Sequence, residues 1–297
     1  MTQITLLDGG MGQELVRRSG DTPTPMWSTQ VMQDHPGLVQ ALHADFFAAG
    51  ATIATTNTYA LHQDRVAGTP VEDQLPDLFA RALKAASTAC SQHGSGQIAG
   101  AIGPLRASYR PDLHPPSPEA ITLFTDVAHH LSHGCDLILC ETVASLAHAR
   151  DVLTAAKTTG KPVWLAVTVD DQNGHVLRSG EPIADVLPIA EAGAAALLVN
   201  CSAPEAITTA LDQIKGTSLP FGAYANGFVQ ISEGFLDPKS TVDALTLRHD
   251  FTPEAYADHV MTWIDMGATI VGGCCEVSPT HIAEIARRLR AAGHTIV

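Results

Sequence analysis

The chain has 297 residues, a length that suits one large α/β domain with a sizeable buried core. Its formal net charge of −14 excludes a nucleic-acid or anionic-membrane surface, because both need a basic footprint. No run approaches the roughly 18 to 20 apolar residues of a membrane span, and the N-terminus has no basic region ahead of an apolar one. We therefore expect a cytoplasmic protein that acts on small molecules, without nucleic-acid or membrane partners.

Eight short apolar, β-branched runs occur along the chain and predict strands. They are Ile4–Leu7, Thr52–Thr56, Gln97–Ile102, Asp136–Cys140, Val163–Val169, Ala196–Asn200, Phe221–Tyr224 and Thr269–Val271. Stretches with helical periodicity separate them, at 37–50, 75–94, 117–134, 145–160, 183–193, 204–216 and 252–267. Most of these end at glycine, as helices do. Eight strands that alternate with helices predict a parallel sheet closed into a (β/α)8 TIM barrel, an α/β fold in which residues 1–297 form one domain.

An open, doubly wound sheet is the alternative arrangement of such a pattern. When that fold binds a dinucleotide, Gly-x-Gly-x-x-Gly follows its first strand directly. The turn here reads DGGMGQE, at residues 8–14, and does not match, so the barrel is favoured. The longest irregular stretch, residues 226–253, is expected to form a loop over the end of the seventh strand.

A TIM barrel carries its chemistry at the carboxyl ends of the strands, and this sequence has polar residues at those ends. Asp8 and Gly9 follow the first predicted strand, Thr56 and Asn57 follow the second, and Glu141 and Thr142 follow the fourth. Asn200 and Cys201 follow the sixth strand, Asn226 follows the seventh, and Cys274 and Cys275 follow the eighth. All of them would face one mouth of the barrel. The amides of Asn57 and Asn226 either bind substrate there or hydrogen-bond to loop backbone.

The six cysteines fall into two groups. Cys90, Cys135 and Cys140 lie in or beside predicted helices and strands, where a small buried hydrophobic residue is the ordinary interpretation. Cys201, Cys274 and Cys275 follow strands six and eight, which flank strand seven in a barrel. Three thiolates with an open fourth position describe a catalytic zinc site. The alternatives are core cysteines or a disulfide between the adjacent Cys274 and Cys275.

Three motifs resemble the homocysteine S-methyltransferase family: DGGMGQEL at 8–15, NCS at 200–202 and GGCCEVSPTHI at 272–282. The resemblance covers nearly the whole chain, and the Gly-Gly-Cys-Cys element is its most specific part. It implies a TIM barrel, a Zn²⁺ ion bound by Cys201, Cys274 and Cys275, and methyl transfer to the sulfur of homocysteine. It also implies that Asp8, Gly9 and Glu141 hold the amino-acid part of homocysteine, while Thr56, Asn57 and Asn226 are further candidate substrate contacts.

Elementary chemistry agrees with this interpretation. A thiol titrates near pH 8.5 and is a poor nucleophile at neutral pH until zinc coordination deprotonates it. The substrate ammonium needs carboxylates, which Asp8 and Glu141 would supply, and its carboxylate needs N–H donors, which the glycine-rich turn would present. Two alternatives stay open, namely that Asp8 caps a helix starting near Gly12 and that Glu141 is a solvated helix start.

The methyl donor is the least constrained part of the prediction. The segments after IGP (102–104) and after the seventh strand depart from the familiar S-methylmethionine-type pattern. A sulfonium leaves as a neutral sulfide, and the chain is short for the folate, cobalamin or betaine members, so we expect S-methylmethionine first, then S-adenosylmethionine or dimethylsulfoniopropionate. Trp27, Tyr59 and Tyr109 lie in predicted loops and would suit a cation. The alternatives are a betaine-type or other thiol methyltransferase, and a non-catalytic zinc or thiol-sensing module.

Overall fold

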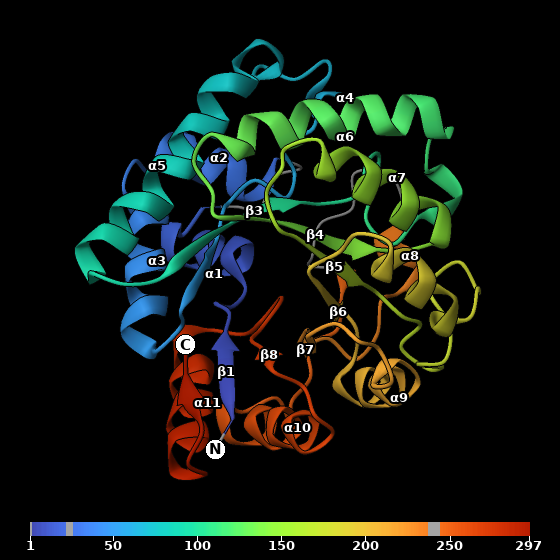
Figure 1. Cartoon of the computed structure of the whole chain (residues 1–297). Coiled ribbons are helices and arrows are strands. Elements are labelled where there is room, and N and C mark those ends of the chain that lie inside the picture. The colour runs from blue at the N-terminus through green and yellow to red at the C-terminus, as the bar shows by residue number, and fades with distance from the viewer. Residues whose placement is uncertain (1, 22–25, 237–243) are drawn as a thin grey trace.

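The structure is a computed structural model that describes residues 2–21, 26–236 and 244–297. Within these ranges, nine parallel strands form one curled sheet in the order β2-β3-β4-β5-β6-β7-β8-β1-β9 (Figure 1). Their bounds are β1 Gln3–Leu6, β2 Ile53–Thr55, β3 Gln97–Ile102, β4 Leu137–Val143, β5 Val163–Val167, β6 Ala196–Asn200, β7 Phe221–Tyr224, β8 Ile270–Val271 and β9 Thr295–Ile296. All eight predicted strands are confirmed.

The sheet closes between β1 and β2. Leu7 forms a parallel bridge with Ile53, and the Thr52 N–H donates to the Leu6 carbonyl at 2.7 Å. The predicted TIM barrel is therefore confirmed, with β1 to β8 as its ring. The ninth strand, which we did not predict, pairs with β1 outside that ring through the Gln3–Thr295 and Ile4–Ile296 pairs.

The helices surround the sheet, as Figure 1 shows. They are α1 Met11–Ser19, α2 Trp27–Asp34, α3 Leu38–Ala49, α4 Gln63–Val66, α5 Leu75–His93, α6 Ser117–Ser132, α7 Leu146–Lys157, α8 Leu187–Glu191, α9 Pro204–Ile214, α10 Pro253–Asp265 and α11 Pro279–Ala291. The seven predicted helical stretches are confirmed, although a 3₁₀ turn at Ile183–Val186 precedes the short α8. Trp27 is a correction: it begins α2 rather than lying in a loop. Within the described parts of the chain, no helix combines the length and apolar character needed to cross a membrane.

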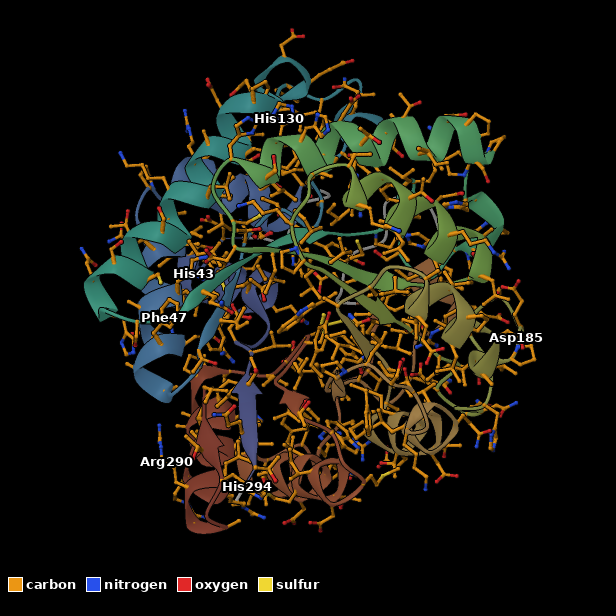
Figure 2. The ribbon with its side chains drawn as sticks, viewed as in Figure 1. His43, Phe47, His130, Asp185, Arg290 and His294 are labelled. Carbon is orange, nitrogen blue, oxygen red and sulfur yellow. A yellow bond between two sulfur atoms is a disulfide. The ribbon has the colours of Figure 1, made fainter. Side chains whose placement is uncertain are left out.

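Two apolar cores follow from the alternation of side chains along the strands, which project from both faces of the sheet (Figure 2). One fills the space between the sheet and the helices. The other fills the ring, and its buried members are Leu7, Ile53, Ala99, Leu137, Leu139, Ala166, Ala196, Leu198, Tyr224 and Ile270. Tyr224 is the largest of these, and its polar end rises from the inner core toward the mouth of the barrel. Cys135 and Cys140 are buried as expected, whereas Cys90 is half-buried against the outer core.

The predicted loop at 226–253 lies partly outside the described residues, at 237–243. In its described parts, Phe228 pairs with Leu247 in an isolated antiparallel bridge, and Glu233–Leu236 forms a 3₁₀ turn. The Gly227 N–H donates to the Cys275 carbonyl at 2.9 Å, so the segment is fastened to the turn after β8. Three of its side chains, Phe228, Phe235 and Leu245, line the pocket described next.

Candidate active site

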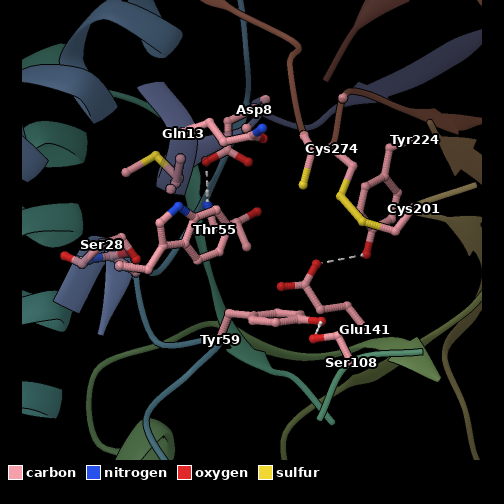
Figure 3. A pocket seen from close by; sticks show the side chains of 18 of the residues that line it. Asp8, Gln13, Ser28, Thr55, Tyr59, Ser108, Glu141, Cys201, Tyr224 and Cys274 are labelled. Atoms are coloured by element: carbon pink, nitrogen blue, oxygen red, sulfur yellow. Dashed lines mark hydrogen bonds between the residues drawn. A yellow bond between two sulfur atoms is a disulfide. The ribbon is translucent and has the colours of Figure 1, made fainter. Parts of the chain in front are cut away.

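A pocket opens at the carboxyl ends of the barrel strands (Figure 3). Its walls come from the segments after β1, β2, β3, β6, β7 and β8 and from β4 itself. Among the predicted site residues, the lining contains Asp8, Gly9, Thr56, Asn57, Glu141, Cys201, Cys274 and Cys275. The described lining does not include Asn226. The barrel thus brings eight of the nine predicted site residues to one cavity.

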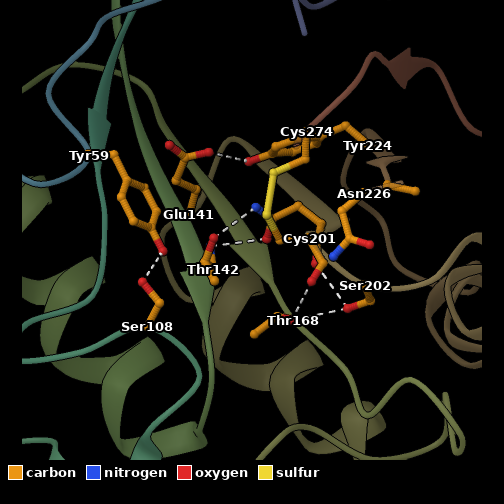
Figure 4. Close-up of a disulfide and its surroundings, with 12 residues drawn as sticks. Tyr59, Ser108, Glu141, Thr142, Thr168, Cys201, Ser202, Tyr224, Asn226 and Cys274 are labelled. Atoms are coloured by element: carbon orange, nitrogen blue, oxygen red, sulfur yellow. Dashed lines mark hydrogen bonds between the residues drawn. A yellow bond between two sulfur atoms is a disulfide. The ribbon is translucent and has the colours of Figure 1, made fainter. Parts of the chain in front are cut away.

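The three predicted metal ligands meet in this pocket. Their Sγ atoms all lie within 4.8 Å of one another. Cys201 and Cys274 are joined in a disulfide, while Cys275 is free (Figure 4). The alternative of a disulfide between adjacent cysteines is therefore wrong, because the partner of Cys274 is on the other side of β7. The sequence alone predicted thiols here, and the pairing arises because the fold places two sulfur atoms in contact.

The cluster fits a metal ion once the disulfide is reduced. Sulfur ligands lie about 2.3 Å from a tetrahedral zinc ion, which puts them roughly 3.8 Å apart. A spread of at most 4.8 Å is close to that requirement and needs only small side-chain rotations. All three cysteines line the pocket, so a fourth position would face the cavity. Three soft sulfur donors and one open position suit a catalytic rather than a structural metal.

Backbone contacts hold the cysteines in place. The Cys201 N–H donates to the Tyr224 carbonyl at 3.1 Å, and the Cys274 N–H donates to the Ala225 carbonyl at 2.9 Å. The two glycines before Cys274 allow this turn to pack closely. A Cβ at Gly272 would overlap Leu7, and a Cβ at Gly273 would overlap Val277. The two glycines of the Gly-Gly-Cys-Cys motif are thus needed for steric reasons, because the backbone before the two cysteines packs closely against the end of β1 and against the turn that follows Cys275.

Asp8 is buried at the end of β1, with 2% of its surface exposed. Its carboxylate accepts a hydrogen bond from the Thr55 N–H at 2.7 Å, which ties β1 to β2 (Figure 3). Burial raises the pKa of Asp8 to about 7, against the lowering effect of that hydrogen bond. The helix-cap alternative is wrong, because Gly10 occupies the N-cap of α1 and no side chain caps it.

Glu141 is also buried, with 8% exposed, and it accepts a hydrogen bond from the Tyr224 hydroxyl at 3.2 Å. Burial raises its pKa to about 8, and the nearby Asp8 adds to this effect. Glu141 lies within β4, so the solvated-helix alternative is wrong. The pairing of β4 with β5 shifts between Cys140 and Val143, and Thr142 has a φ of 59°. This bulge redirects the side chains at the strand end.

Thr56 and Asn57 line the pocket but also serve the backbone. The Thr56 hydroxyl accepts from the Ala101 N–H at 3.0 Å, and the Asn57 amide donates to the Ser28 carbonyl at 3.2 Å. Asn226 accepts from the Phe228 N–H at 3.2 Å, and its amide nitrogen is buried without a hydrogen-bond partner among the described residues. The side chains of Thr56, Asn57 and Asn226 thus hydrogen-bond to the backbone of neighbouring segments, and their contacts with substrate stay a prediction.

Aromatic side chains form much of the pocket wall. They are Trp27, Tyr59, Tyr109, Tyr224, Phe228 and Phe235. Sequence reasoning identified the first three and missed the others, because Tyr224 reads as an ordinary strand residue and the two phenylalanines lie in an irregular segment. The Tyr59 hydroxyl hydrogen-bonds to the Ser108 hydroxyl at 2.7 Å, and the rings of Tyr109 and Phe235 meet edge to face at 6.0 Å. The wall is therefore built from side chains that hold one another.

A buried ion pair supports this wall from behind. Arg178 donates two hydrogen bonds to Asp171, each at 2.9 Å, and the guanidinium lies 5.2 Å from the Tyr109 ring centroid. Asp171 also accepts from the Ala203 N–H at 2.9 Å and the Ile231 N–H at 2.8 Å. One carboxylate thus joins the loops after β5, β6 and β7. Sequence reasoning missed the pair, because both residues lie in a polar loop like any other.

Comparison with known proteins agrees with the geometry. Residues 5–289 match the family model described as homocysteine S-methyltransferase. A homocysteine S-methyltransferase of Escherichia coli K12 is 31% identical, with 96% of this chain and 95% of that protein covered. The homocysteine S-methyltransferase YbgG of Bacillus subtilis 168 is 27% identical over 97% and 95% of the two chains.

Solved structures agree as well. The metallated form of the E. coli homocysteine methyltransferase MmuM superposes with a TM-score of 0.80 at 26% identity, covering 97% of this chain and 96% of that one. Its oxidized form gives a TM-score of 0.81 at the same identity, with 96% of each chain covered. The fold, the cysteine cluster and these matches lead to one conclusion: the chain belongs to the homocysteine S-methyltransferase family of enzymes.

Proposed function

We propose that this enzyme transfers a methyl group from a sulfonium donor, with S-methylmethionine as the first choice, to the thiol of homocysteine, producing methionine. The observation that carries the proposal is the convergence of three cysteine sulfurs and two buried acids on one pocket. The family supports homocysteine as the acceptor. The donor, the zinc ion and the cytoplasmic location are our own predictions.

Cys201, Cys274 and Cys275 would hold the zinc ion in the reduced protein. Bound there, zinc lowers the pKa of a coordinated thiol, so that homocysteine carries a nucleophilic sulfur at neutral pH. The chain must keep the Cys201 and Cys274 sulfurs reduced, because a disulfide removes two of the three ligands. A non-catalytic zinc module is disfavoured, since in the described part of the chain no fourth His, Cys, Asp or Glu joins the three cysteines.

Asp8 and Glu141 would bind the homocysteine ammonium. With its pKa raised to about 7, Asp8 is about half protonated at pH 7 in the free enzyme, and Glu141, with its pKa raised to about 8, is mostly protonated. An ammonium beside them favours the ionised forms and lowers both pKa values. The substrate carboxylate would lie at the start of α1, where Gly10, Met11 and Gly12 line the pocket and the helix dipole favours an anion.

The donor argument rests on the leaving group and the pocket wall. The thiolate sulfur forms the new bond to the methyl carbon, the old carbon–sulfur bond breaks, and its electrons neutralise the sulfonium, so no proton is required. The aromatic wall offers ring faces to a sulfonium cation. A quaternary ammonium such as betaine would use the same rings, and it is therefore the second candidate.

A donor screen tests this proposal. Reduced, zinc-loaded enzyme is incubated with homocysteine and, in turn, S-methylmethionine, S-adenosylmethionine, dimethylsulfoniopropionate, betaine or methyltetrahydrofolate with and without cobalamin, and methionine is measured. We expect methionine from a sulfonium and none from methyltetrahydrofolate. Activity with betaine and no sulfonium, or with methyltetrahydrofolate alone, would refute the donor choice.

The acceptor site has its own test. Glu141→Gln keeps the shape of the side chain but removes the charge, so the KM for homocysteine should rise roughly 10- to 100-fold, the scale of a charged hydrogen bond. Glu119→Gln, an exposed change on α6, is the matched control and should leave that KM unaltered. An unchanged KM in Glu141→Gln would remove Glu141 from the ammonium site.

A further inference from the structure

Arg65 is the one lysine or arginine among the described residues that line the pocket. It lies on the short helix α4, after β2. Two acidic side chains, Asp8 and Glu141, share the same cavity. If both substrates are amino acids, as in the proposed reaction with S-methylmethionine, each brings a carboxylate. The pocket must therefore provide two anion sites, and the start of α1 accounts for one.

The guanidinium of Arg65 has donors to spare. Its one hydrogen bond to another described residue goes to the Pro104 carbonyl at 3.5 Å, the outer limit of such a contact. A guanidinium carries five N–H donors in a planar fork that matches a carboxylate. Other arginines near the pocket are already paired, Arg106 with Glu119 and Arg178 with Asp171. Arg65 is half-buried and lies against the Tyr59 ring, with its central carbon 5.7 Å from the ring centroid.

The position of Arg65 in the barrel suits a donor molecule. In the closed ring, β2 lies four strands from β6, so the segment after β2 faces the segment that carries Cys201 across the mouth. Tyr59 and Arg65 both line the pocket, and the Tyr59 hydroxyl is held by its hydrogen bond to Ser108 at 2.7 Å. A donor whose carboxylate lies at Arg65 can place its sulfonium on the aromatic wall and its methyl group toward the cysteines.

We propose that Arg65 binds the carboxylate of the methyl donor, and that the enzyme consequently selects sulfonium compounds that also carry a carboxylate. This inference rests on the proposed sulfonium reaction. It divides the pocket between the substrates: Asp8, Glu141 and the start of α1 hold homocysteine, while Arg65 and the rings hold the donor. A carboxylate-free sulfonium then binds through the aromatic wall alone.

The test compares two kinds of sulfonium in the reduced, zinc-loaded enzyme. The KM for S-methylmethionine, the KM for homocysteine and the inhibition constant of dimethylpropylsulfonium, which has no carboxylate, are measured for wild type, Arg65→Gln and Arg65→Lys. Arg65→Gln should raise the KM for S-methylmethionine roughly 10- to 100-fold, the scale of a charge-assisted hydrogen bond. The homocysteine KM and the inhibition constant should stay within about twofold, and Arg65→Lys should recover part of the loss. Arg106→Gln, which removes a paired arginine outside the lining, is the matched control.

Three results would overturn the assignment. An unchanged KM for S-methylmethionine in Arg65→Gln removes the residue from the donor site. A raised KM for homocysteine moves it to the acceptor. An equal loss of affinity for S-methylmethionine and dimethylpropylsulfonium would make the role of Arg65 structural. If Arg65→Gln fails to fold, Arg65→Lys, which keeps the charge and the aliphatic stem, provides the same comparison. If the wild-type enzyme uses no sulfonium donor, the proposed function itself fails, a result distinct from an active wild type with an unaffected variant.

Discussion

The burial of Glu141 should make the stability of the folded protein depend on pH, whether or not the protein is catalytically active. The pKa of Glu141 is about 8 in the folded protein, against an ordinary value of 4.5. An acid with a raised folded-state pKa keeps its proton in the folded protein after the unfolded chain has lost it. The contribution of Glu141 to the free energy of unfolding is therefore largest below about pH 4.5 and is lost as the pH rises toward 8.

The size of the effect follows from the same values. Each pH unit between the folded and unfolded pKa is equivalent to about 1.4 kcal/mol. Going from 4.5 to about 8 sets an upper limit of roughly 5 kcal/mol for this one carboxyl group. Only 8% of the residue is exposed, so solvent screening reduces that value little. The hydrogen bond from Tyr224 favours the carboxylate and already opposes the rise.

The assay is urea unfolding of the reduced, metal-free protein at pH 5 and pH 8.5, for wild type and Glu141→Gln. A glutamine stays neutral at both values, so wild type should lose about 2 to 5 kcal/mol more than the variant over this interval. Asp8 is present in both proteins, and its contribution largely cancels in the difference. Glu119→Gln, at an exposed position, should match wild type. Equal losses for wild type and Glu141→Gln would refute the argument.

Two further predictions concern the cysteine cluster and the buried ion pair. Reduced wild type should bind about one zinc per chain, and Cys275→Ala should lose most of the metal and nearly all activity while staying folded. Cys135→Ala, which changes a cysteine outside the cluster, should keep its zinc. Metal analysis measures the zinc content and circular dichroism measures the folding, and a Cys275→Ala variant that keeps its metal and its activity would refute the site. Asp171→Asn breaks a pair whose side chains are 4% and 9% exposed, so we expect a loss of roughly 3 to 5 kcal/mol in urea unfolding, and a loss under about 1 kcal/mol would contradict a supporting role.

Local patterns were enough for the barrel and for the approximate location of the site. The eight strands and seven helical stretches were readable because hydrophobic periodicity depends on neighbours in the chain. In a parallel barrel, the strand ends share one mouth, so Asp8, Glu141 and the three cysteines were expected together before any coordinates. The two-residue strand β9 escaped prediction, because a segment that short carries no period.

Other features of the site depend on residues far apart in the sequence. The inward position of Glu141 comes from a bulge in the β4–β5 pairing, and its raised pKa comes from burial that many segments create together. Cys274 pairs with Cys201, 73 residues away, because β6 and β8 flank β7. The aromatic wall and the Arg178–Asp171 pair likewise join loops that follow different strands.

The sequence by itself determined the parallel α/β pattern, the chemical types at the strand ends and the motifs that mark the family. Those properties belong to single residues or to short stretches, and no long-range contact is needed to recognise them. Tertiary structure alone decided which sulfurs touch, which acids are shielded from solvent, and which arginine lines the pocket without an ion pair to any described residue. Distance, burial and charge pairing are set by packing between distant segments, and a linear pattern does not contain them.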